Sequence, residues 1–170
     1  LPSGSLLHAA KASAASAEAA AMDPQQRLLL ESGYASLNVS RLFRSSLLGT
    51  NTGVYLGYSS SDFGQVLATS PLGLSVYSAT GSSGSIASGR LSYALGLHGA
   101  CALIDTACSA SLVASHASLR ALQRSECEMA LSAGVNMLLE PAAMIGHAVA
   151  GFTSARGRSH TFDVRADGYA

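Results

Sequence analysis

The sequence has few charged residues, and the two signs balance. Only 12% of the 170 residues are charged, and ten basic residues offset ten acidic ones. Nucleic acids and anionic membranes attract proteins through clustered basic charge. The composition therefore gives no basis for a nucleic-acid partner or for binding to a membrane surface.

Cysteines and metal-ligand patterns are also sparse. The three cysteines, Cys101, Cys108 and Cys127, are odd in number and widely spaced. This usage argues against a disulfide framework and favours an intracellular reducing compartment, cytoplasmic or organellar. The five histidines form no zinc-ligand spacing with the cysteines. We expect no metal site and no bound cofactor.

The sequence contains no convincing membrane span. Residues 63–89 form a long uncharged stretch, but it is rich in Ser, Gly and Thr and contains Pro71. Such a stretch is too polar for the hydrocarbon layer. The hydrophobic content of 48% suffices for one core, so we expect residues 1–170 to form one partial domain. Within it, residues 1–21 are expected to be a weakly specified lead-in, with helix from Ala9 onward.

A well-formed helix start follows the lead-in. Asp23 is a candidate N-cap, Pro24 occupies the first helical position, and Gln26 falls at the capping-box position. The residues expected on the buried face of this helix are Leu30, Tyr34 and Leu37. The other elements expected before residue 100 are a strand at 54–56, a short helix from Asp62 that ends before Pro71, and a helix at 82–95 with close backbone contacts at Gly84 and Gly89.

The pattern is clearest from residue 100 onward. We expect a strand at 101–107, a helix at 109–123 and a second strand at 129–135. This order predicts a parallel pair joined by a right-handed crossover. Ligands of open parallel sheets bind outside the carboxyl ends of the strands, and Cys108 lies at such an end. A further helix at 141–150 and a loop at 151–170 complete the chain.

Cys108 is the candidate nucleophile. A thiol at a helix N-terminus meets a partial positive charge, which favours the reactive thiolate. The opposing interpretation is that free cysteines are usually buried and inert. His116 follows eight residues later, roughly 12 Å along a helix, whereas a general base needs contact near about 3 Å. The general base therefore stays unassigned.

Two other motifs favour structural interpretations. Residues 84–91 have the glycine spacing of a phosphate-binding loop, but Arg90 replaces the lysine and Leu91 replaces the metal-binding hydroxyl. Helix packing through small residues is the better interpretation. Residues 163–168 superficially resemble a calcium loop that lacks its middle acidic ligand, so we expect a turn held by aspartate hydrogen bonds.

Residues 105–112, Asp-Thr-Ala-Cys-Ser-Ala-Ser-Leu, resemble the active-site signature of β-ketoacyl synthases, specifically the ketosynthase domains of type I polyketide synthases. Further segments resemble the family in the same order along the chain: 21–31, 52–57, 78–81, 86–93, 133–136, 161–163 and 166–169. The chain departs from the family at Ala100 or Cys101, where a proline is usual, and at Ser159 and His160, where cysteine and lysine are usual.

The resemblance implies an α/β, thiolase-like fold, the N-terminal half of a layered αβαβα architecture whose mixed sheet has a parallel βαβ unit around the nucleophile turn. It also implies that Cys108 takes an acyl chain from the phosphopantetheine arm of an acyl-carrier protein. Condensation with a decarboxylating malonyl thioester then gives 3-oxoacyl-carrier protein, in polyketide or fatty acid biosynthesis. The complete protein is expected to be a homodimer.

The family's two catalytic histidines are expected beyond residue 170, so the isolated piece is expected to be inactive. Two alternatives remain open from the sequence. One is a non-catalytic ketosynthase-like subunit that sets chain length or docks partners, although such subunits usually lack the cysteine. The other is a phosphate- or nucleotide-binding α/β module, disfavoured by the incomplete loop at residues 84–91.

Overall fold

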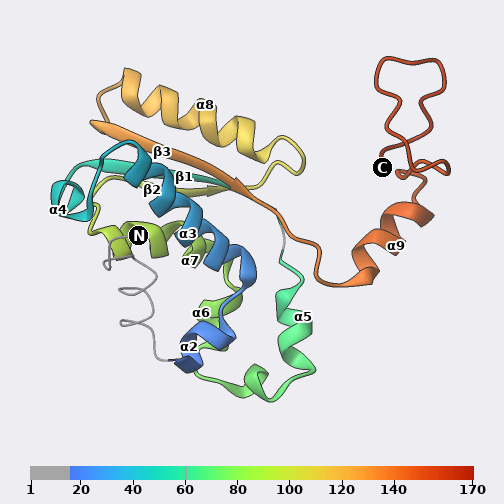
Figure 1. Cartoon of the computed structure of the whole chain (residues 1–170), viewed down its shortest axis with the longest axis horizontal. Helices are drawn as coiled ribbons and strands as arrows, with labels where there is room; N and C mark the ends of the chain where they lie inside the picture. Colours follow the sequence, from blue (N-terminus) through green and yellow to red (C-terminus); the bar gives the residue numbers. More distant parts are fainter. Residues whose placement is uncertain (1–15, 60) are drawn as a thin grey trace. The chain divides into compact units, whose positions relative to one another are not determined.

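The computed structural model describes residues 16–59 and 61–170, which divide into two compact units (Figure 1). The first unit runs to Met137, and the second is Leu138–Ala170. The expected helix from Ala9 begins outside the described residues; its described part is α2 (Ser16–Ala21). None of the helices in the described ranges combines the length and apolar character needed to cross a membrane.

A parallel sheet forms the centre of the first unit. In the described residues it has three strands, β1 (Thr52–Tyr58), β2 (Cys101–Ile104) and β3 (Met129–Val135), in the order β2-β1-β3. All seven residues of β1 are buried, as suits a central strand. The parallel direction of β2 and β3 is confirmed. The two strands do not pair with each other, however, because β1 lies between them.

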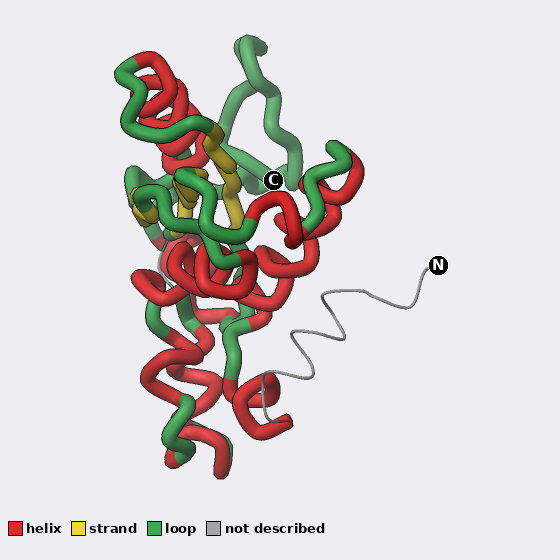
Figure 2. Tube along the Cα trace, turned by 90° about the vertical axis from the view of Figure 1, so that its left-hand side faces the viewer, coloured by secondary structure: helices red, strands yellow, loops and turns green. Residues whose placement is uncertain are grey.

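Helices cover both faces of this sheet. Helix α8 (Ala110–Gln123) packs on one face, and α3 (Pro24–Val39) and α7 (Gly84–Leu95) pack on the other (Figure 1). Figure 2 gives the side view, with the strands in yellow between the helices. Side chains alternate along β1, so Val54 and Leu56 enter the cores on the α3 and α7 side, whereas Tyr55 packs near Ala114 of α8.

The start of α3 agrees with the sequence only in part. The Asp23 carboxylate accepts a hydrogen bond from the Gln25 N–H at 2.7 Å, and Pro24 lies in the first turn, so the N-cap is confirmed. Gln26 does not close a capping box. Its amide nitrogen instead donates to the carbonyl oxygens of Thr80 at 3.2 Å and Ser83 at 3.0 Å. A long-range contact thus replaces the local one.

The buried face of α3 also differs from the expected one. Leu29, Gly33 and Leu37 are buried, whereas Leu30 and Tyr34 are only partly buried. Helix α7 sets this rotation, because a Cβ added to Gly33 would lie 2.9 Å from a methyl group of Leu91. Helices α3 and α7 are therefore in close contact at Gly33, where α3 has no side chain.

Several short elements join these helices and strands. They are α4 (Arg44–Leu47), α5 (Phe63–Ala68), a 3₁₀ turn (Pro71–Leu74) and α6 (Ser78–Ser82). The expected helix at 82–95 begins at Gly84, because Ser83 is extended and separates it from α6. A Cβ on Gly84 would lie 3.0 Å from a methyl group of Leu103, so the contact at Gly84 is close, and it is made with side chains of β1 and β2. The expected contact at Gly89 is not found among residues 16–59 and 61–170, where a Cβ on Gly89 would meet nothing within 4 Å.

The second unit consists of α9 (Pro141–Val149) and a long loop, as the sequence predicts. The phenol of Tyr169 lies 2.7 Å from His147 Nδ1, and Tyr169 forms an isolated bridge with Thr153. The expected aspartate turn is confirmed, since Asp163 Oδ1 accepts hydrogen bonds from the backbone and the side chain of Arg165. This ion pair lowers the pKa of Asp163 and raises that of Arg165.

Candidate active site

Cys108 lies in an exposed turn between β2 and α8. Strand β2 ends at Ile104, three residues earlier than the sequence predicts, and α8 begins at Ala110. The strand ends early because the Asp105 carboxylate bonds to the backbone two residues ahead and turns the chain. Residues 105–109 are all exposed. The thiol of Cys108 is therefore at the carboxyl edge of the sheet and accessible.

Local hydrogen bonds hold this turn. Asp105 Oδ1 accepts from the Ala107 N–H at 3.0 Å, and Ala107 has a left-handed φ of 53°. That conformation costs a residue with a Cβ about 1–2 kcal/mol. The Ser109 hydroxyl lies 2.8 Å from the Thr106 carbonyl oxygen. The N–H groups of Ser109 and Ala110 donate to the carbonyls of Thr106 and Ala107, so part of the expected free helix-terminal N–H set is already bonded.

The first turn of α8 rests directly on two glycines of the sheet. A Cβ added to Gly57 of β1 would lie 2.5 Å from the backbone nitrogen of Ser111, and one added to Gly134 of β3 would overlap the Ser111 hydroxyl. Gly57 and Gly134 pair with each other in the sheet register. The start of α8, and with it Cys108, is therefore placed by backbone-to-backbone contact.

The three thiols lie in different surroundings. Cys127 is 4% exposed and packs beneath α8, whereas Cys101 and Cys108 are both exposed. Exposure alone does not separate Cys101 from Cys108. Their positions do, because Cys101 begins β2 and Cys108 follows its carboxyl end. Of the two exposed thiols, Cys108 occupies the edge where ligands of parallel sheets bind.

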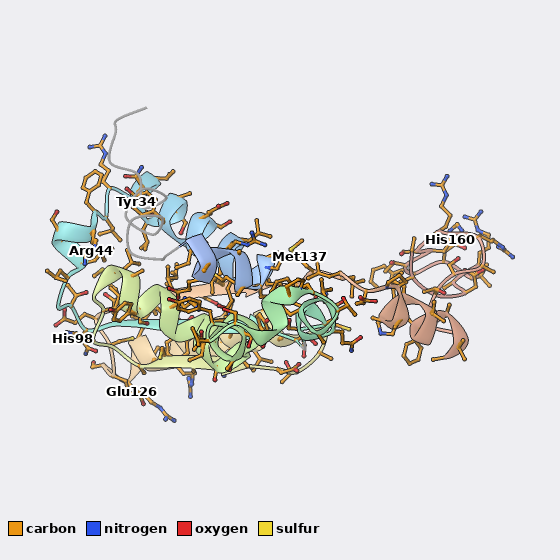
Figure 3. All side chains as sticks on the ribbon, turned by 90° about the horizontal axis from the view of Figure 1, so that it is seen from below. Tyr34, Arg44, His98, Glu126, Met137 and His160 are labelled. Atoms are coloured by element: carbon orange, nitrogen blue, oxygen red, sulfur yellow. The ribbon has the colours of Figure 1, made fainter. Side chains whose placement is uncertain are left out.

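Within the described residues, no hydrogen bond or ion pair joins Cys108 to a histidine. His116 is exposed on α8, two turns beyond the thiol. His98 precedes β2 and thus lies at the amino end of the strand. Figure 3 labels His98 and Met137 at opposite ends of the first unit, and Cys108 belongs to the Met137 end, where the strands finish. The sequence-based conclusion that no base is assigned therefore stands.

Other candidate sites receive no support from the described residues. Residues 84–91 lie inside α7, so their glycines are helical and form no phosphate-binding loop. No group of three or more histidine, cysteine, aspartate or glutamate side chains in the described ranges could hold a metal ion. A groove of about 460 Å³ lies between α3 and β3, but its lining does not include Cys108.

A buried polar cluster at the same edge was not expected from the sequence. Asp23 is fully buried, and its Oδ2 accepts hydrogen bonds from the hydroxyls of Tyr58, at 3.0 Å, and Ser61. Burial, together with the Asp23 charge, raises the pKa of Tyr58 to about 12. Gln25 Oε1 accepts from the Met137 N–H at 3.1 Å, so the cluster joins the ends of β1 and β3. Its sequence signal, Asp23 to Gln26, indicates only a helix cap.

The fold and site define an α/β protein with a parallel sheet and an exposed cysteine in the turn between a strand and the helix that covers the sheet. The profile of the family described as "Beta-ketoacyl synthase, N-terminal domain" matches residues 7–170. The chain therefore belongs to the β-ketoacyl synthase family and represents the N-terminal part of its ketosynthase domain.

Similar proteins agree with this assignment. The chain is 45% identical over 152 residues to a mycocerosic acid synthase-like polyketide synthase of Mycolicibacterium smegmatis, covering 89% of this chain and 7% of the relative. It is 44% identical over 153 residues to a non-reducing polyketide synthase of Penicillium canescens, covering 90% of this chain and 6% of the relative.

Solved structures confirm the thiolase-like ketosynthase fold. A ketosynthase from module 6 of the bacillaene synthase of Bacillus subtilis 168 matches with a TM-score of 0.76 and 36% identity, over 89% of this chain and 25% of that one. An oxazolomycin ketosynthase domain of Streptomyces albus matches with a TM-score of 0.81 and 31% identity, over 92% of this chain and 27% of that one. The chain thus spans about a quarter of these solved ketosynthases.

Proposed function

We propose that this chain forms the nucleophile-bearing part of an acyltransferase of the β-ketoacyl-[acyl-carrier-protein] synthase type. In the first step, the Cys108 thiolate attacks the carbonyl carbon of an acyl thioester on the phosphopantetheine arm of an acyl-carrier protein. The bond from that carbon to the pantetheine sulfur breaks, the carrier thiol leaves, and the acyl group is held on Cys108.

In the second step, a malonyl thioester on a carrier protein loses carbon dioxide. The electron pair of the broken bond forms a carbanion, which attacks the Cys108 thioester. The cysteine sulfur leaves with its electron pair, and 3-oxoacyl-carrier protein is released, two carbons longer than the acyl group. The histidines that assist decarboxylation in the family are assigned to the part of the ketosynthase that this chain does not span.

One observation chiefly supports this proposal. Cys108 is exposed at the carboxyl edge of a parallel sheet, at the start of the helix that covers it, within the family-matched range. Within the part of a ketosynthase that this chain spans, a thiol at this point is open to an incoming thioester. The acyl-carrier protein as partner and the homodimeric state of the complete protein belong to the same proposal.

The test compares two cysteine variants of the complete ketosynthase that contains this chain. Cys108→Ala is expected to lower condensation of acyl- and malonyl-carrier protein by roughly 10³-fold or more, as expected for loss of a nucleophile. Cys101→Ala removes the other exposed thiol and is expected to retain activity. Condensation by Cys108→Ala at the wild-type rate would overturn the proposal.

Alkylation with iodoacetamide near neutral pH separates the proposal from a non-catalytic subunit. We expect Cys108 to react faster than Cys101, although both are exposed. Equal and slow alkylation of the two thiols would instead favour the subunit that sets chain length or docks partners. The isolated 170-residue chain is expected to show no condensation, and turnover of malonyl-carrier protein by it would contradict that expectation.

A further inference from the structure

We propose that Asp105 is a positioning residue for Cys108, and that it acts by holding Ala107 in its left-handed conformation. This inference rests on the proposed role of Cys108 as nucleophile. The residue that precedes the thiol has a φ of 53°, and the carboxylate of Asp105 accepts the N–H of this same residue at 3.0 Å. One side chain thus stabilises the backbone conformation that directs Cys108.

The left-handed conformation needs such support because Ala107 has a Cβ. Residues other than glycine rarely adopt it, and the next peptide unit takes its direction from it. An aspartate that accepts a hydrogen bond from the backbone two residues ahead favours a turn of this kind. Without the bond, Ala107 would relax toward the common regions with negative φ, and the thiol would move with it.

Within the part of the ketosynthase that this chain spans, packing gives the turn little alternative support. All five residues from 105 to 109 are exposed, and Ala110 is the first buried residue after them. The hydrogen bonds found for the turn side chains in the described structure stay within the turn: Asp105 to Ala107, and Ser109 to Thr106. These side-chain bonds act together with the backbone bonds from the Ser109 and Ala110 N–H groups to the Thr106 and Ala107 carbonyls, and the Asp105 bond is the side-chain bond made to Ala107.

The proposed role of Asp105 rests on its hydrogen bond to the Ala107 N–H and not on its charge. A positioning role and a charge role can be separated with two variants. Asp105→Asn and Asp105→Ala remove the same charge, but only asparagine keeps an oxygen that can accept the Ala107 N–H.

The experiment measures acyl transfer to Cys108 in the complete ketosynthase, together with the pH profile of Cys108 alkylation by iodoacetamide. Asp105→Ala is expected to lower the acyl-transfer rate roughly 10- to 100-fold relative to Asp105→Asn, in the range seen for small misplacements of reacting groups. The two variants are expected to share one alkylation pH midpoint, because they carry the same charge.

A second substitution tests the mechanism directly. Glycine adopts a left-handed φ without a supporting bond, so Ala107→Gly is expected to restore most of the activity lost in Asp105→Ala. Should Asp105→Ala not fold, the double variant Asp105→Ala/Ala107→Gly is compared directly with Asp105→Asn. Activity of the double variant below a tenth of that of Asp105→Asn overturns the proposal.

Equal rates for Asp105→Ala and Asp105→Asn, or failure of Ala107→Gly to restore activity, would also overturn it. Cys108→Ala is the control for the nucleophile itself. If that variant keeps full activity, the proposed function fails independently of Asp105.

Discussion

Gly57 of β1 lies directly against Ser111 of α8, with room for no side chain between them. A Cβ on Gly57 would lie 2.5 Å from the backbone nitrogen of Ser111 and 2.6 Å from the carbonyl carbon of Ala110. Both neighbours are backbone atoms, so neither can rotate away. The sheet therefore fixes how far the first turn of α8 lies from β1, and this turn follows Cys108 in the sequence.

Gly57→Ala is predicted to push the start of α8 off the sheet. Overpacking against backbone costs roughly 1–3 kcal/mol of the free energy of unfolding, and the displaced turn should slow alkylation of Cys108. Urea unfolding and iodoacetamide kinetics measure the two effects. Unchanged stability together with an unchanged Cys108 rate would show that the contact has no such influence.

Gly134→Ala is predicted to be rescued by Ser111→Gly, whereas Gly57→Ala is not. A Cβ on Gly134 would meet the hydroxyl and Cβ of Ser111, which are side-chain atoms that the second substitution removes. A double-mutant cycle on the free energy of unfolding should give a favourable coupling of about 0.5–3 kcal/mol for this pair. The same cycle between Gly57→Ala and Ser111→Gly is the matched control. Similar coupling in both cycles would contradict the geometry.

Stability is predicted to fall at high pH through Tyr58. Burial and the Asp23 charge raise the pKa of Tyr58 from 10.0 to about 12, so the unfolded chain ionises first. The contribution of the neutral phenol is complete below pH 10 and is lost as the pH rises through 12. The stability difference between wild type and Tyr58→Phe, measured by urea unfolding, should therefore narrow across this range. If the stability difference between wild type and Tyr58→Phe stayed constant across this pH range, ionisation of the buried phenol would not be the cause of the loss of stability at high pH.

Gly89→Ala is predicted to stabilise the protein. Gly89 lies inside α7, and a Cβ there would meet no atom of the described part of the chain within 4 Å. Alanine is favoured over glycine in a helix interior by roughly 0.5–1 kcal/mol, which should appear as a higher urea midpoint. Gly33→Ala is the contrasting substitution, since its Cβ would crowd Leu91. A lower midpoint for Gly89→Ala would show that another group occupies this space.

The segment from residue 101 to residue 135 could be predicted well because its signals are local. Strand β3 matches the sequence-based bounds, and α8 differs by one residue at its start. The error at the end of β2 has a local cause too, namely the bond from Asp105 to Ala107. An apolar run indicates a strand but does not show where a side chain will turn it.

Other features required contacts that sequence spacing does not contain. Gln26 has the capping-box position, yet its amide bonds to Thr80 and Ser83, more than fifty residues away. The close packing of α8 on the sheet requires two residues without side chains, Gly57 and Gly134, which become neighbours only when β1 pairs with β3. The place of β1 between β2 and β3 likewise depends on the register of distant strands. The position of Cys108 after a strand and before a helix could therefore be predicted from its motif, whereas the contacts that place this turn could not.

The most direct test of the central claim is to locate the acyl group. The complete ketosynthase is incubated with an acyl-carrier protein thioester, digested, and analysed by mass spectrometry. We predict one acyl group per ketosynthase chain on the peptide that contains Cys108, and none on the corresponding peptide of Cys108→Ala. An acyl group found on another residue, or an equal acyl content in Cys108→Ala, would contradict the assignment of Cys108 as the nucleophile.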